Sequence, residues 1–341
     1  MGLSKPIVVQ IIKNWTDKWM SDAALLSQTP EGSGYVRNVK FVLGPVEEPD
    51  YVIVLNRAPR RTEVRCRPSN LWLVLQEPPN EICAPLHKGQ SIFSRVYMSD
   101  PRNVGPRYQL SHPPIPHFIG VSHDFLVDCP VPDKSKQIGC ILSYNRMYQG
   151  HEARQKYFSV LSKHIAIDHY GIGVRDFKSK WDTFAPYRYA VVLENFVHPW
   201  YWSEKIADTF LTWTMPFYLG SSRIHEYFSK AAVQVLPPDD PIEGARIIRS
   251  AIEADLWSKN FSALQQARDL VIQNYGLFAF LAHEIERNEL RKGGQEQPIR
   301  ISIPPVSAAI LGMWARSKFR AFHLNALASL QKLAPKQDHS P

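Results

Sequence analysis

The sequence YRYAVVLENFVHPWYWSEKIADTFLTWTMPFYLGSSR occupies residues 187–223 and predicts a strand, a loop, a helix and a second strand. Tyr189–Leu193 is an apolar run of strand length that ends at two polar residues. Ser203 is a suitable N-cap for the helix that follows. We expect this helix to carry Ile206, Phe210 and Trp213 on one face, Pro216 to close it, and Phe217–Leu219 to begin the next strand.

Polar residues cluster in this stretch where an α/β sheet binds its ligands. Ligands of open α/β sheets lie beyond the carboxyl ends of strands, against helix N-termini. A lysine and free backbone N–H groups suit a phosphate, and a carboxylate suits a ribose diol. For any single residue, an ordinary βαβ unit with a surface Glu-Lys pair is the better interpretation. The whole cluster predicts a pocket formed by Glu194, Asn195, Tyr201, Glu204 and Lys205.

The same stretch resembles the α1,3/4-fucosyltransferase family, in its bacterial type. The family signature is Phe-Glu-Asn-Ser, a short gap, Tyr-x-Thr-Glu-Lys, and then Val/Ile-Pro-x-x-x-Gly. This chain has Leu-Glu-Asn-Phe at 193–196, Tyr-Trp-Ser-Glu-Lys at 201–205 and Met-Pro-Phe-Tyr-Leu-Gly at 215–220. Phe196 stands in place of the family's serine, and Ser203 in place of its threonine. The second change keeps an N-cap residue.

The resemblance implies a fold, a reaction and a set of site residues. The fold is GT-B, two Rossmann-like α/β domains facing a cleft, with which alternating strands and helices are compatible. The reaction moves L-fucose from GDP-β-L-fucose to a hydroxyl of an N-acetylglucosamine- or glucose-containing glycan, with inversion, as in protein glycosylation and other glycan biosynthesis. Residues expected to bind GDP-fucose are Arg154, Glu194, Asn195, Tyr201, Glu204, Lys205, Ser143, Asn145, Tyr170 and Gly171.

The first half of the chain supplies the expected catalytic base. Ile7–Ile12, Tyr51–Leu55 and Leu71–Leu75 are apolar runs of strand length. Glu77 follows the third run and precedes two prolines, which suits a carboxylate facing a cleft. A solvated loop acid is the alternative. Family members have a strand that ends in Glu-Ser-Pro or a variant, and the resemblance implies that Glu77 is the general base.

The second half begins with a strand at Ile138–Leu142, before Ser143 and Asn145, and a helix over about His151–Lys163. Arg154 lies in the first turn of this helix. A cation there opposes the helix macrodipole, which favours an anion between the two. The family has Ser-Asn, a variable gap and an arginine that binds the pyrophosphate, which implies this role for Arg154. Tyr170-Gly171, after a strand at Ile165–His169, resembles the family's Asp-x-Tyr-Gly turn.

Length and composition favour two domains. The chain has 341 residues, of which 44 % are hydrophobic, enough for one large core or two smaller ones. Prolines and lysines make 111–136 the expected connection between domains. We therefore expect an acceptor-binding α/β domain at 1–130, a nucleotide-sugar-binding Rossmann-like domain at 131–300, and a C-terminal helix with a basic tail at 301–341. Residues 245–290 are mostly helical by periodicity.

The formal charge of +8 is concentrated at the end of the chain, where nine basic and three acidic residues follow position 286. Residues 307–333 predict an amphipathic helix that either packs on the core or lies on a membrane surface. No apolar run reaches the ~20 residues of a transmembrane helix, and no signal peptide or myristoylation motif is evident. The four cysteines are too sparse for a disulfide framework. We expect a cytoplasmic enzyme, peripheral at the inner face of the membrane.

The sequence contains no Asp-x-Asp, His-Glu-x-x-His or Walker A motif. We therefore expect no metal site and no tightly bound cofactor, with a divalent metal stimulating at most. Lys205, Arg154 and helix N-terminal amides would then stabilise the leaving diphosphate. Two alternatives stay open: a GT-B transferase for another nucleotide sugar, and a non-catalytic basic protein that binds nucleic acid or lipid. The basic residues lack the aromatic interleaving of a single-strand-binding surface, so we expect no nucleic-acid partner.

Overall fold

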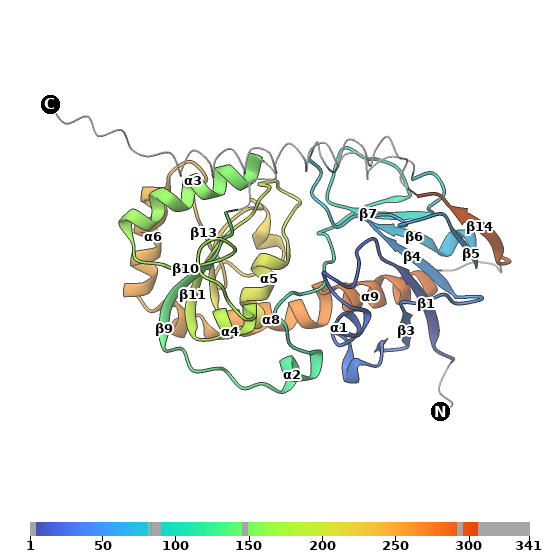
Figure 1. Cartoon of the computed structure of the whole chain (residues 1–341), viewed down its shortest axis with the longest axis horizontal. Coiled ribbons are helices and arrows are strands. Elements are labelled where there is room, and N and C mark those ends of the chain that lie inside the picture. Colours follow the sequence, from blue (N-terminus) through green and yellow to red (C-terminus); the bar gives the residue numbers. More distant parts are fainter. Residues whose placement is uncertain (1–4, 81–82, 84–89, 145–148, 292–295, 306–341) are drawn as a thin grey trace.

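The computed structural model describes residues 5–80, 83, 90–144, 149–291 and 296–305. Two mainly parallel sheets lie side by side, and helices α8 and α9 run end to end across the junction between them (Figure 1). The predicted α/β class is confirmed. The predicted helix at 307–333 and Asn145 lie outside the described residues. Within the described part of the chain, no helix is long and apolar enough to cross a membrane.

The first sheet has the order β2-β3-β1-β4-β6-β7-β8 and is parallel except for the β2–β3 pair. The predicted strands Ile7–Ile12 and Tyr51–Leu55 are confirmed as β1 and β4, and the third predicted strand ends one residue early. The elements of this part are β1 (Ile7–Ile12), α1 (Asp22–Leu26), β2 (Tyr35–Val36), β3 (Val39–Val42), β4 (Tyr51–Leu55), β5 (Thr62–Cys66), β6 (Leu71–Val74), β7 (Arg95–Met98) and β8 (Tyr108–Leu110).

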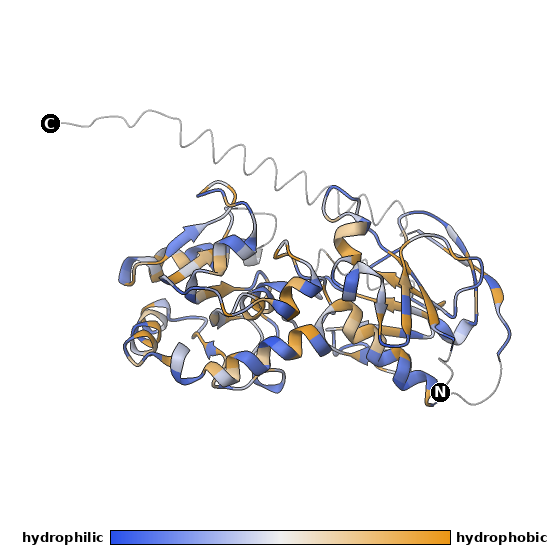
Figure 2. Ribbon diagram, turned by 90° about the horizontal axis from the view of Figure 1, so that it is seen from below, coloured by the Kyte–Doolittle hydropathy of each residue, from blue (hydrophilic) through white to orange (hydrophobic). Residues whose placement is uncertain are grey.

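Different elements cover the two faces of the first sheet. One face packs against α9 (Leu277–Glu289), whose Phe278 meets Phe41 with ring centroids 5.0 Å apart. The other face packs under an antiparallel ribbon in which β14 (Ile299–Ile303) pairs with β5. All five residues of β4 are buried, as expected for a strand covered on both faces. Figure 2 shows the apolar strands inside and helices with one polar face outside.

The second sheet has the order β10-β9-β11-β12-β13 and is parallel throughout. Helices α4, α5 and α8 cover one face, and α3 and α6 cover the other. The elements are α2 (His123–Asp128), β9 (Lys136–Ile141), α3 (Gln149–His164), β10 (Asp168–Tyr170), α4 (Lys180–Phe184), β11 (Tyr187–Leu193), α5 (Glu204–Leu211), β12 (Met215–Leu219), β13 (Gln234–Val235), α6 (Pro241–Glu253), α7 (Leu256–Lys259) and α8 (Phe261–Leu270).

The described part of the chain crosses between the two sheets twice. The forward crossing contains the predicted connection at 111–136. The return crossing is a π-helical turn, Val271–Tyr275, between α8 and α9. Because α9 and β14 pack on the first sheet, residues 277–291 and 296–303 lie with the N-terminal part. The sequence had assigned nearly all of this segment to the second domain, since helical periodicity does not say which sheet a helix covers.

Two local predictions were wrong. Trp213 is not in the helix, because α5 ends at Leu211 and Trp213 takes a left-handed conformation with φ of 58°. Pro216 does not close the helix but lies inside β12, where it pairs with Ala190. The helix ends earlier because the left-handed Trp213 closes a Schellman turn, in which the Thr214 N–H donates to the Thr209 carbonyl and the Trp213 N–H to the Phe210 carbonyl, both at 2.9 Å. In α3, Ala153 faces solvent, whereas Tyr157, Phe158 and Leu161 are buried.

Candidate active site

A buried carboxylate ties the end of β11 to the start of α5. Glu194 directly follows β11 and is 1 % exposed. Its Oε1 accepts a hydrogen bond from the Ser203 backbone N–H at 2.9 Å, and the Ser203 hydroxyl lies 2.9 and 2.8 Å from the two carboxylate oxygens. The same hydroxyl caps α5 by accepting from the Lys205 N–H. Glu194 therefore supports the start of the helix, with its oxygens engaged inside the protein.

Lys205 is the centre of an ion-pair cluster at this helix start. Its Nζ lies 3.2 Å from Glu204 Oε1, 3.5 Å from Glu194 Oε2 and 3.0 Å from the Ser203 hydroxyl. Burial opposes the charge on Lys205, but Glu204 and Glu194 raise its pKa above the ordinary value. Burial likewise opposes the charge on Glu204, yet Lys205 and Lys180 hold its pKa down to about 2. Both side chains are charged at neutral pH.

Arg154, in the second turn of α3, adds a second cation. The residue is only 9 % exposed, and its Nε has no hydrogen-bond partner among the described residues. Burial lowers the pKa of its guanidinium, an effect that Glu194 and Glu204 only partly oppose. A buried cation with an unused N–H donor can bind an acceptor group of a ligand. Arg154 also lines the cavity described next.

A cavity of about 170 Å3, here called the strand-end cavity, lies among these groups. It opens at the carboxyl ends of β9 and β11, where ligands of parallel sheets bind. Of the described residues that line it, the polar ones are Ser143, Arg154, Lys180, Glu204 and Lys205.

Lys180 is a cation of this cavity that sequence reasoning missed. Its Nζ lies 2.6 Å from Oδ2 of Asp208, whose side chain is fully buried, and it also helps to lower the pKa of Glu204. Lys180 begins α4, a helix that the sequence analysis did not predict, and no spacing in the sequence connects it with Lys205. Only the folded chain brings the two lysines to one cavity.

Asn195 lies beside the start of α3 rather than in the wall of the strand-end cavity. A Cβ atom on Gly150 would come within 1.7 Å of the Asn195 carbonyl oxygen, so only glycine allows this approach. Asn195 Nδ2 is 3.4 Å from Nε2 of His151. Burial, with the nearby cations Arg154 and Lys205, lowers the pKa of His151 to about 3, so the ring is neutral. Sequence reasoning missed this histidine too.

Glu77 comes from the first sheet and reaches the same region. It lies just beyond β6, is half-buried, and accepts a hydrogen bond from the Cys83 thiol at 3.9 Å. Burial raises the pKa of the Tyr201 hydroxyl well above its usual value, and the carboxylates of Glu194, Glu204 and Glu77 raise it further. The Glu77 carboxylate is therefore within electrostatic range of the Tyr201 hydroxyl. Tyr201 itself is 4 % exposed.

Tyr170 and Gly171, which were expected to bind GDP-fucose, are not among the described residues that line the strand-end cavity. The Tyr170 hydroxyl lies 2.9 Å from the Tyr187 hydroxyl and accepts from Arg175 at 3.2 Å, so the side chain is engaged outside the strand-end cavity. Gly171 has φ of 143°, and a Cβ there would come 2.7 Å from the Leu142 carbonyl. Its role is to let the chain pass close to β9. The described residues include no group of His, Cys, Asp or Glu arranged to hold a metal ion.

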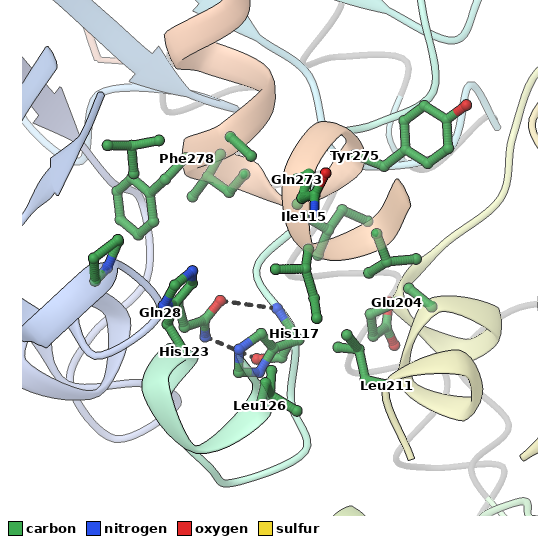
Figure 3. Close-up of a pocket in the computed structure, with 18 of the residues that line it drawn as sticks. Gln28, Ile115, His117, His123, Leu126, Glu204, Leu211, Gln273, Tyr275 and Phe278 are labelled. Carbon is green, nitrogen blue, oxygen red and sulfur yellow. Dashed lines mark hydrogen bonds between the residues drawn. The ribbon is translucent and has the colours of Figure 1, made fainter. Parts of the chain in front are cut away.

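A larger cavity of about 330 Å3, here called the junction cavity, lies between the two chain crossings. Figure 3 shows its lining residues, with Gln28 hydrogen-bonded to His117 on one side and Glu204 on the other. Glu204 is the residue that the two cavities have in common.

Comparisons with known proteins support the resemblance for one segment. Residues 131–239 match the family model described as glycosyltransferase family 10 (fucosyltransferase), C-terminal region. The chain is 32 % identical over 96 residues to 4-galactosyl-N-acetylglucosaminide 3-alpha-L-fucosyltransferase 9 of Homo sapiens and of Bos taurus. This match covers 27 % of this chain and 26 % of each relative. The chain therefore spans about a quarter of the length of the curated relatives that it matches.

Solved structures with a similar chain course include an alpha1,3-fucosyltransferase with GDP and a glycosyltransferase from Rickettsia africae. The first has a TM-score of 0.48 and 14 % sequence identity, and the match covers 80 % of this chain and 92 % of that one. The second has a TM-score of 0.49 and 9 % sequence identity, and the match covers 85 % of this chain and 100 % of that one.

Proposed function

We propose that this protein is an inverting α1,3-fucosyltransferase with GT-B architecture that transfers L-fucose from GDP-β-L-fucose to a glycan hydroxyl. The observation that carries the proposal is the cluster of Arg154, Glu204 and Lys205 at the carboxyl edge of the second sheet, inside the segment that matches the family model. The curated relatives are named as 3-alpha-L-fucosyltransferases, which supports the same reaction. The acceptor would be an N-acetylglucosamine- or glucose-containing glycan.

On the donor side, we assign the diphosphate of GDP-fucose to the strand-end cavity. Arg154 offers a buried guanidinium with an unused Nε–H, and Lys205 offers an ammonium group at the N-terminus of α5. As the bond between fucose C1 and the phosphate oxygen breaks, negative charge grows on the diphosphate. These cations stabilise that charge, which is how a preorganised site lowers a barrier. Glu204 would bind the ribose hydroxyls, and Glu194 would position Ser203 and Lys205.

On the acceptor side, we assign the general base to Glu77. An acceptor hydroxyl attacks C1 from the face opposite GDP, the new C1–O bond forms, and its proton passes to the Glu77 carboxylate. Glu77 belongs to the first sheet, whereas the cations belong to the second, so the two sets of groups approach the sugar from different sides. The Cys83 thiol donates to this carboxylate and holds its orientation.

The division of the chain follows from the same proposal. The acceptor domain would comprise residues up to about 130 together with 277–303, and the donor domain 131–276. We propose that the basic stretch at 307–333 lies on an anionic membrane surface, which would give the protein a peripheral cytoplasmic location; packing on the core is the alternative. Divalent metal would at most stimulate transfer.

Nucleotide binding and transfer test the proposal together. GDP and GDP-fucose should raise the melting temperature, while UDP and ADP should not, because the site is assigned to a guanine nucleotide. A ligand at 100 times its Kd adds about 2.7 kcal/mol to the stability. Fucose transfer to N-acetyllactosamine, measured with GDP-[14C]fucose, should accompany GDP binding. Stabilisation by UDP in place of GDP would refute the assignment of the donor.

A further inference from the structure

The junction cavity has the dimensions of a small-molecule site and lies apart from the strand-end cavity. Ligand pockets of proteins usually have volumes from about 300 Å3 upward, and this cavity measures about 330 Å3. The forward crossing lines it with Ile115 and His117, and the return crossing lines it with Val271 to Ala279. Ala207 and Leu211 of α5 close the third side (Figure 3).

The walls of this cavity are fixed by specific contacts. The Gln28 side chain holds the His117 backbone through two hydrogen bonds, donating to the carbonyl at 2.9 Å and accepting from the N–H at 3.0 Å. On the opposite wall, the His112 ring stacks on Trp202 with centroids 4.6 Å apart and planes within 6°. The His112 Nε2 is also 3.1 Å from the Tyr275 carbonyl oxygen. The cavity is therefore a built feature of the junction.

The polar atoms around the cavity are incompletely paired. Two residues of its lining carry buried nitrogen atoms with no hydrogen-bond partner in the described part of the chain, the indole Nε1 of Trp202 and the imidazole Nδ1 of His117. Leaving a buried polar group unpaired destabilises the folded state. The indole nitrogen can only donate, so it requires an acceptor atom. Burial lowers the pKa of His117 to about 3, so its ring is neutral.

The charges in the lining are already compensated. Glu204 is paired with Lys205 at 3.2 Å, and Arg37 is paired with Glu286 at 3.0 Å. A charged guest would find no unpaired opposite charge there and would lose its hydration. The remaining lining is mostly apolar and includes Ile115, Leu211 and Phe278.

We propose that the junction cavity binds an uncharged, largely apolar ring compound whose carbonyl or ether oxygen accepts a hydrogen bond from the Trp202 indole N–H. The compound bridges the two chain crossings. Of the described residues that line the two cavities, Glu204 is shared, so this site borders the proposed donor site, but the proposal does not depend on the proposed reaction.

Two matched probes test the proposal on the full chain. Indan-1-one carries a carbonyl acceptor, and indane is the same bicycle without it. Each is titrated while the indole N–H signals of the nine tryptophans are followed by NMR. Trp202→Phe identifies the Trp202 signal by its disappearance. Indan-1-one should move this signal downfield in a saturable manner, and indane should not.

Variants separate binding from surface contact. Trp202→Phe should weaken indan-1-one roughly 2- to 12-fold, the equivalent of one neutral hydrogen bond, and leave indane within about twofold. Ala279→Phe fills the cavity and should abolish binding of both probes, whereas Ala24→Phe on the exposed face of α1 should keep it. If Ala279→Phe does not fold, Ala207→Leu fills the cavity from the other wall. Absence of saturable binding to the wild type, or binding that survives the filled cavity, would overturn the proposal.

Discussion

Replacing Arg154 with methionine should separate binding from stability. Burial opposes the charge on this guanidinium, and the pKa is lowered despite Glu194 and Glu204. In the absence of GDP, the charged side chain therefore contributes little to the stability of the folded protein. A methionine of similar length keeps the apolar contacts of α3 and removes the charge. We expect Arg154→Met to unfold within about 1 kcal/mol of the wild type, or to be slightly more stable.

The expected loss of GDP affinity is much larger. A hydrogen bond to a charged group contributes about 1.5–3 kcal/mol, which corresponds to roughly a 10- to 150-fold change in Kd. At a GDP concentration of 100 times the wild-type Kd, the nucleotide adds about 2.7 kcal/mol to the wild type. A variant that binds about 100-fold more weakly would gain only about 0.4 kcal/mol at that concentration.

Isothermal titration with GDP and thermal unfolding with and without GDP measure both quantities. The matched control is Arg246→Met, because Arg246 is exposed on α6 and pairs there with Glu243. The control should bind GDP like the wild type. If Arg154→Met binds GDP with wild-type affinity, or if it unfolds several kcal/mol more easily, Arg154 is a structural residue and the reasoning fails.

Two further predictions concern stability. Ser203→Ala removes the cap of α5 and the hydroxyl donor to buried Glu194, and should cost about 1–3 kcal/mol in urea unfolding, whereas Ser203→Thr should cost less than half of that. Burial lowers the pKa of His112 from 6.5 to about 4. The neutral ring is therefore favoured in the folded state, and its contribution is present above pH 6.5 and lost as the pH falls towards 4. The free energy of unfolding should fall by about 3 kcal/mol over this pH range. His112→Phe keeps an aromatic ring on Trp202 and should flatten that part of the plot of stability against pH. If the variant shows the same pH dependence as the wild type, the assignment to His112 is wrong.

Local patterns predicted the parts of the fold that depend on neighbouring residues. The strand β4 is a continuous apolar run, β1 and β11 are apolar except for Gln10 and Arg188, and the N-cap at Ser203 is a short-range signal. The end of α5 was missed because it depends on Trp213 adopting a positive φ, a conformation rare for a tryptophan. The packing of α9 on the first sheet was missed because an amphipathic helix fits either sheet equally well.

The residues of the candidate site were also predicted only in part. The motif at 201–205 marked the start of α5, and the structure gathers Glu204, Lys205 and Arg154 around one cavity. Lys180 was not predicted because α4, the helix that it begins, was not predicted either. Glu194 had been expected in the pocket wall, but sequence cannot say whether a carboxylate after a strand faces a ligand or a helix N-terminus. In the folded chain, the hydrogen bonds between Glu194 and Ser203 show that this carboxylate faces the start of α5.

The central claim is that Glu77 of the first sheet acts on a sugar held by the second, and Glu77→Gln tests it most directly. The glutamine keeps the size and hydrogen bonding of the side chain but cannot take the proton of the acceptor hydroxyl. A positioned general base contributes roughly 10²–10⁴-fold to the rate. Transfer from GDP-fucose and GDP binding are measured on the same preparation, with Glu63→Gln on β5 as the matched control. The account predicts that transfer falls by about that factor while the Kd for GDP stays within about twofold. Full transfer activity, or loss of GDP binding together with activity, would contradict it.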